Sequence, residues 1–140
     1  MKLLLDTHFA VWLTLGGENL IVPERRLIVA NAADLTVSAV SIWELRLKWH
    51  SFHASGARKG PADPADVLAA MIGSGCAILP ITADHVATVL EVPLDHGDLF
   101  DELLLVQAQV EGLRLLTRDR AMAGHPLVVR DADPSMTRLR

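Results

Sequence analysis

HGDLFDELLLVQAQVEGLRLLTRD, residues 96–119, is the stretch that decides the fold. Asp98 can cap a helix with its carboxylate, and Gly112 can end it because glycine adopts a left-handed conformation without strain. The apolar run 113–116 then indicates a buried strand, which closes at Asp119. For the helix between, we expect one apolar face at helical spacing, formed by Leu99, Leu103, Val106 and Val110.

The rest of the chain alternates short apolar runs with helix signals. We expect strands at 1–5, 35–40 and 76–81, helices at 7–15, 23–33, 41–49, 64–73 and 82–90, and a helical turn with an edge strand in 121–129. Thr7 is the expected cap of the first helix, and Ser41 with Glu44 matches a capping box. This order predicts an α/β fold with a mostly parallel sheet, in one domain over 1–130 with a polar tail at 131–140. Right-handed crossovers place the carboxyl ends of all strands on one edge.

The composition of the chain excludes several classes of protein. Of 140 residues, 51% are hydrophobic, which excludes a disordered protein. The formal charge is −4, so a polyanionic ligand needs a local basic patch or a bridging cation. Cys76 is the single cysteine, which excludes an intrachain disulfide and fits a reducing compartment. Asp6 interrupts the first apolar run too early for a signal peptide or a membrane span, so we expect a soluble, cytoplasmic protein.

Acidic residues fall where strands end or the following helices begin. They are Asp6, Glu44, Asp101 and Asp119, with Asp98 close by. Each alone has a structural explanation as a helix cap or a dipole partner. At one sheet edge they would repel, because two charges ~4 Å apart cost about 4 kcal/mol at an effective dielectric of ~20. Such a cluster needs a proton or a cation, and an all-oxygen site suits Mg²⁺ or Mn²⁺, which can activate water for phosphodiester hydrolysis.

Four ordered segments resemble the PIN-domain ribonuclease toxins of the VapC type. They are LLLDTH (3–8), SAVSIWELRLK (38–48), DHGDLFDELLLVQAQ (95–109) and LLTRD (115–119), and the likeness covers position 3 to about 123. The resemblance implies a PIN-like three-layer α/β/α sandwich. It also implies a Mg²⁺- or Mn²⁺-dependent endoribonuclease toxin, a cognate antitoxin protein that inhibits it, an RNA substrate and a homodimer.

The resemblance assigns roles residue by residue. By it, the ion is held by Asp6, Glu44, Asp101 and Asp119, Asp98 is accessory, and the hydroxyls of Thr7 and Thr117 orient a carboxylate or a water. Two positions depart from the usual third motif of the family: Leu99 stands where proline is common, and Glu102 where a base is common. Glu102 leaves open an alternative, a weak or inactive PIN-type metal-binding module that serves interaction alone.

Basic side chains near these motifs are candidates for contact with RNA phosphates. They are Arg46, Lys48, Arg58, Lys59, Arg118 and Arg120, and the alternative for each is an ordinary solvated surface. His50 and His53 lack the further ligand that a zinc site needs, whereas His96, beside the acids, is a histidine to test. A phosphoacceptor receiver would need a lysine after the last strand, and a haloacid-dehalogenase phosphatase an aspartate where His8 stands.

Overall fold

The chain begins with a three-residue strand, because the apolar run is cut short by Asp6, which caps the following helix. The structure is a computed structural model that describes residues 1–95 and 97–129. Its strands are β1 (Leu3–Leu5), β2 (Leu35–Ser38), β3 (Ala77–Leu79), β4 (Arg114–Leu116) and β5 (Val128–Val129). Its helices are α1 (Thr7–Thr14), α2 (Val22–Ala30), the 3-10 turn η1 (Ala32–Asp34), α3 (Ala39–Trp49), α4 (Pro64–Gly73), α5 (Ala83–Ala87) and α6 (Leu99–Glu111).

The described strands form one sheet in the order β3-β2-β1-β4-β5, and every pair is parallel. The predicted parallel α/β architecture is therefore confirmed. Leu5 at the end of β1 lies opposite Val37 of β2 and Leu116 of β4. The residues that come next, side by side at the carboxyl edge, are Asp6, Ser38 and Thr117.

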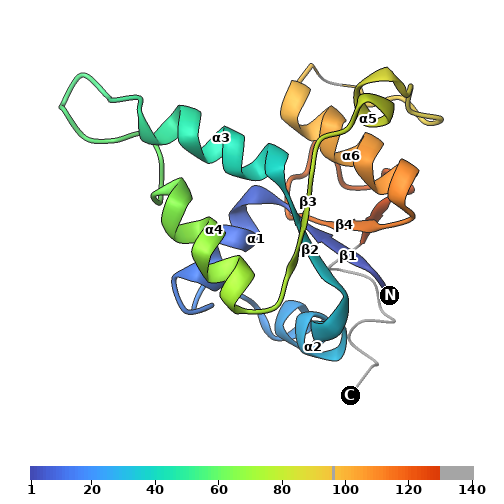
Figure 1. Ribbon diagram of the computed structural model, residues 1–140, viewed down its shortest axis with the longest axis horizontal. Helices are drawn as coiled ribbons and strands as arrows, with labels where there is room; N and C mark the ends of the chain where they lie inside the picture. The colour runs from blue at the N-terminus through green and yellow to red at the C-terminus, as the bar shows by residue number, and fades with distance from the viewer. Residues whose placement is uncertain (96, 130–140) are drawn as a thin grey trace.

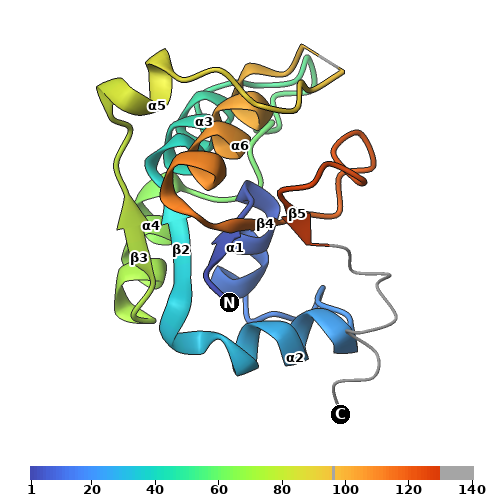
Figure 2. The same ribbon diagram turned by 90° about the vertical axis from the view of Figure 1, so that its right-hand side faces the viewer.

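Helices cover both faces of the sheet, as Figures 1 and 2 show. Alternation along β1 places Leu3 and Leu5 in a core with α1, α2 and α4, and Leu4 in a second core with α6. In Figure 1, α1 and α4 lie on one side of the strands and α5 and α6 on the other. The three-layer α/β/α sandwich implied by the family resemblance is confirmed.

α6 begins and ends as predicted, but its buried face differs. Asp98 accepts a hydrogen bond from Asp101 N at 3.0 Å, and Gly112 ends the helix at φ +68°. The predicted apolar face is wrong at both ends, since Leu99 is 77% exposed and Val110 40%. The buried residues are instead the consecutive run 104–108, which covers a full turn, so the middle of the helix is buried all round.

α3 begins at Ala39, two residues earlier than predicted, and its cap lies three residues earlier. β2 ends at Ser38, whose Oγ accepts a hydrogen bond from Val40 N at 3.0 Å and caps the helix. The capping box of Ser41 and Glu44 is therefore wrong, and both residues lie inside the helix. Likewise Asp6, not Thr7, caps α1, because a carboxylate already stands at the strand end.

The buried side-chain amide of Gln107 connects α6 to the start of α3. Gln107 of α6 accepts a hydrogen bond from Ser38 Oγ and donates one to Pro80 O at 3.3 Å. Its Nε2 also lies 3.3 Å from Nδ1 of the buried His85, on α5. This network fixes α6 against the start of α3.

Smaller differences concern the ends of elements and the stretch before β5. α5 ends at Ala87 instead of 90, and 120–124 form turns instead of a helical turn, while β5 is the predicted edge strand. His96, Arg130 and the predicted tail at 131–140 lie outside the described residues. Among the helices described, none combines the length and apolarity needed to span a bilayer.

Candidate active site

Asp6 is the most deeply placed of the predicted acids. It follows β1 directly and is 5% exposed. Its Oδ1 accepts a hydrogen bond from Phe9 N at 3.0 Å, and its Oδ2 accepts one from Thr117 Oγ1 at 2.6 Å. The carboxylate is thus held rigidly at the carboxyl edge of the central strand.

Glu44 approaches Asp6 from α3. Its Oε1 accepts a hydrogen bond at 2.6 Å from Oγ1 of Thr7, the residue after Asp6. Its Oε2 pairs with Lys48 Nζ at 2.9 Å, one helical turn further on. The structure therefore places each of the two predicted threonine hydroxyls against a different acid.

The surroundings of Asp6 disfavour its charge. Burial raises the pKa of the Asp6 carboxyl, and the negative charge of Glu44 adds to the rise. The bonds from Thr117 and Phe9, and the charge of His8, oppose it without cancelling it. Asp6 forms no salt bridge with any residue that the structure describes.

The remaining predicted acids lie nearer the solvent at the same edge. Asp119 N donates to Thr117 Oγ1 at 3.1 Å, so this residue is linked to Asp6 through one hydroxyl. Asp98 and Asp101 lie at the start of α6, which runs antiparallel to the strands and so begins at their carboxyl edge. Trp43 and Phe100, which precede Glu44 and Asp101, stack edge to face with centroids 5.1 Å apart.

The donor set fits a divalent cation such as Mg²⁺. Within 1–95 and 97–129, no three acidic, histidine or cysteine side chains are already gathered around a common point. Mg²⁺ does not require such a cage, because it binds through one or two carboxylates and keeps several waters. Among the described residues, Asp6 supplies a buried carboxylate that forms no salt bridge, and the buried Ser41 hydroxyl, one turn before Glu44, forms no hydrogen bond.

The predicted RNA contacts divide into two groups. The guanidinium of Arg118 bonds to the fully buried Glu24 and lies 4.3 Å from the Trp12 ring, so it serves the core. Arg58 stacks on Trp49 at 4.3 Å, and Lys48 pairs with Glu44. Among these predicted contacts, Arg46, Lys59 and Arg120 are exposed and form neither a salt bridge nor a cation–π contact with the described residues.

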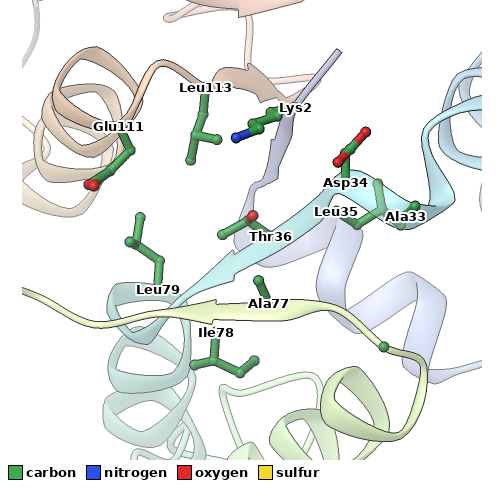
Figure 3. Close-up of a pocket in the computed structure, with 11 residues that line it drawn as sticks. Lys2, Ala33, Asp34, Leu35, Thr36, Ala77, Ile78, Leu79, Glu111 and Leu113 are labelled. Atoms are coloured by element: carbon green, nitrogen blue, oxygen red, sulfur yellow. The ribbon is translucent and has the colours of Figure 1, made fainter.

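A cavity of about 380 Å³ lies at the opposite edge of the sheet (Figure 3). It is lined by residues at the amino ends of strands, including Lys2, Thr36 and Ala77, and by Glu111 at the end of α6. In open α/β sheets, ligands bind at the carboxyl ends of the strands. The acids, rather than this cavity, therefore mark the candidate active site.

The sequence analysis missed two contacts and one hydroxyl. Glu24 and Arg118 are 94 residues apart, and no spacing rule connects them. The i,i+4 spacing of Glu44 and Lys48 is the usual signal of a helical ion pair and would have revealed that contact. Ser41 was missed because it resembled a helix cap.

Comparisons with known proteins agree with this architecture. The PIN domain family model matches residues 3–125. No curated protein matches the sequence significantly. A toxin–antitoxin complex from Klebsiella pneumoniae contains a chain that is 21% identical, with a TM-score of 0.62 over 93% of this chain and 98% of that one.

A DNA-bound VapBC from Salmonella typhimurium contains a chain that is 16% identical, with a TM-score of 0.55 over 91% of this chain and 95% of that one. At these identities the two structures establish a shared fold. The family model covers most of the sequence and includes all four principal acids. The resemblance inferred from the sequence is therefore confirmed, and the chain belongs to the PIN domain family.

Proposed function

We propose that the protein is a divalent-metal-dependent endoribonuclease, the toxin of a toxin–antitoxin pair. The observation that carries this proposal is the pairing of a buried, uncompensated Asp6 with Glu44 at the carboxyl edge of the sheet. The PIN family, and the toxin–antitoxin complexes that share the fold, support it.

In this proposal Asp6 and Glu44 hold Mg²⁺ or Mn²⁺, with Asp101 and Asp119 completing the acidic edge. When bound, the ion supplies Lewis acidity, which activates water and stabilises charge on the phosphodiester. Thr117 fixes the Asp6 carboxylate and Thr7 fixes that of Glu44, so neither has to reorient when substrate arrives. Arg46, Lys59 and Arg120 are the cations available to RNA phosphates.

A protein partner has a suitable surface beside the site. An apolar groove of about 370 Å³ lies between α3 and α4, lined by Ile42, Trp43, Ala65 and Leu68, with Arg46 among its residues. Trp43 is 44% exposed although it is large and apolar. We propose the antitoxin as the partner at this groove, and a homodimer as the toxin's own assembly.

The test compares purified, antitoxin-free wild type with Asp6→Asn on structured RNA in Mn²⁺. We expect Asp6→Asn to cut the cleavage rate by about 10³-fold or more, because losing the ion's several kcal/mol of charge stabilisation has that size. Asp66→Asn, an exposed acid at the start of α4, is the matched control and should cleave normally. A fully active Asp6→Asn protein, or cleavage that survives a chelator, would refute the proposal; no cleavage by wild type would favour the interaction module.

A further inference from the structure

Ser41 carries a buried hydroxyl that has no partner. The residue is fully buried in the first turn of α3, and its Oγ forms no hydrogen bond within the part of the chain that the structure describes. Unpaired buried polar groups are rare in native proteins, because each loses its hydrogen bonds to water and gains none in the protein. A bound species absent from the protein alone is one physical explanation.

Hydroxyls at the carboxyl ends of α1 and α4 form hydrogen bonds to the backbone. Thr14 Oγ1 donates to Ala10 O at 2.8 Å, and Ser74 Oγ donates to Ala70 O at 2.7 Å. In both cases the hydroxyl forms a hydrogen bond to the carbonyl four residues earlier, which is a common arrangement for serine and threonine in helices. Ser41 forms no such bond, so its hydroxyl is available for another acceptor.

The position of Ser41 connects it to the acids. It precedes Glu44 by three residues, and residues at this spacing share one side of a helix. Helical side chains lean toward the amino end, so Glu44 extends back over the turn that contains Ser41. The Glu44 carboxylate in turn meets Thr7, next to Asp6. The orphan hydroxyl therefore lies on the side of α3 that carries Glu44, one turn before it.

We infer that Ser41 Oγ is a positioning group of the divalent-cation site, bonding to the hydrated cation instead of to protein. The inference rests on the proposed function. Mg²⁺ and Mn²⁺ keep several waters in such sites, and a hydroxyl beside the carboxylates can orient one of them. It also explains why a hydroxyl occupies a buried position at which alanine would satisfy the metal-free fold.

The test measures Mn²⁺ affinity by calorimetry and the unfolding free energy of metal-free protein by urea titration. We expect Ser41→Ala to weaken Mn²⁺ binding on the order of 10–100-fold, the usual cost of removing such a partner. Its metal-free stability should equal or exceed that of wild type, because an unpaired group is removed. Ser74→Ala, which removes a hydroxyl at the far end of α4, should bind Mn²⁺ like wild type.

The outcomes separate this inference from the function on which it rests. If Asp6→Asn abolishes Mn²⁺ binding while Ser41→Ala binds like wild type, the role of Ser41 is refuted and the metal site stands. A wild type that binds no Mn²⁺ overturns both. Should Ser41→Ala fail to fold, the near-isosteric Ser41→Cys replaces it, and its weaker donor should reduce affinity by an intermediate amount; unchanged affinity refutes the inference.

Discussion

Two buried carboxylates, Asp6 and Glu24, show how differently one fold treats the same chemistry. Glu24 is 0% exposed, and Arg118 compensates it by donating Nε–H to Oε2 at 2.6 Å and by a second contact to Oε1. Ile21 N donates to the same group at 2.9 Å. Asp6 is 5% exposed, has no salt bridge among the described residues, and faces the negative charge of Glu44.

The difference separates a structural charge from a functional one. A buried charge is tolerated when it is paired and hydrogen-bonded, and Glu24 meets both conditions. Asp6 is hydrogen-bonded but forms no salt bridge with the described residues, so the metal-free protein disfavours its charged form. A buried carboxylate of this kind lowers stability unless a cation binds it, so we expect a cation at the acidic edge of the sheet.

The largest expected effect on stability is at the ion pair of Glu24 and Arg118. Arg118→Met should lower the unfolding free energy by about 3 kcal/mol, because it leaves Glu24 buried without its partner. Urea denaturation measures the loss. The double variant Glu24→Gln with Arg118→Met should recover most of it, since the unpaired charge is gone. A single-variant loss within experimental error would show that Glu24 is not a compensated charge.

Asp6→Asn should act in the opposite direction. Removing the uncompensated charge is expected to raise the stability of the metal-free protein by about 1 kcal/mol at neutral pH, while the amide oxygen can still accept from Phe9 N. Thermal unfolding in the presence of a chelator measures this. A less stable Asp6→Asn protein would mean that the Asp6 charge is compensated after all.

The raised pKa of Asp6 also predicts how the stability of this variant, relative to wild type, depends on pH. The folded state raises the pKa of Asp6, so between the unfolded value, about 3.9, and the folded value the folded protein holds the extra proton. Stability from this group is therefore present at low pH and is lost as pH rises through the folded pKa. The stability difference between Asp6→Asn and wild type should grow with pH over that interval and then level off; a flat difference contradicts the raised pKa.

The smallest effect is expected at Lys48. Its pair with Glu44 is exposed, so Lys48→Met should change stability by no more than about 0.5 kcal/mol. Because Lys48 neutralises the carboxylate that would hold the ion, its loss should tighten Mn²⁺ binding by about twofold, the equivalent of the same small energy. Calorimetry measures this, and weaker binding would assign Lys48 a supporting role instead.

The fold followed from local signals wherever these were unambiguous. The parallel sheet follows from short apolar runs that alternate with helices, and Asp98 and Gly112 bound α6 as their chemistry requires. Which of two neighbouring residues would cap a helix could not be predicted from the sequence. Ser38 and Asp6 cap their helices because the sheet register ends each strand there, so the next hydroxyl along the chain was the wrong choice.

The site was predictable in composition but not in its internal contacts. The carboxyl-edge rule identified Asp6 and Glu44 as neighbours, since strand ends meet there whatever lies between them. The bond between Thr117 and Asp6 spans 111 residues, and that between Arg118 and Glu24 spans 94. Contacts of that kind depend on how whole helices pack, which local patterns do not encode.

Anomalous diffraction from crystals equilibrated with Mn²⁺ tests the central claim most directly. The account predicts a manganese peak at coordinating distance, roughly 2.0–2.2 Å, from oxygens of Asp6 and Glu44, with the ion retaining waters, and no such peak in Asp6→Asn. A peak at another part of the molecule, or none at concentrations that saturate cleavage, would contradict it.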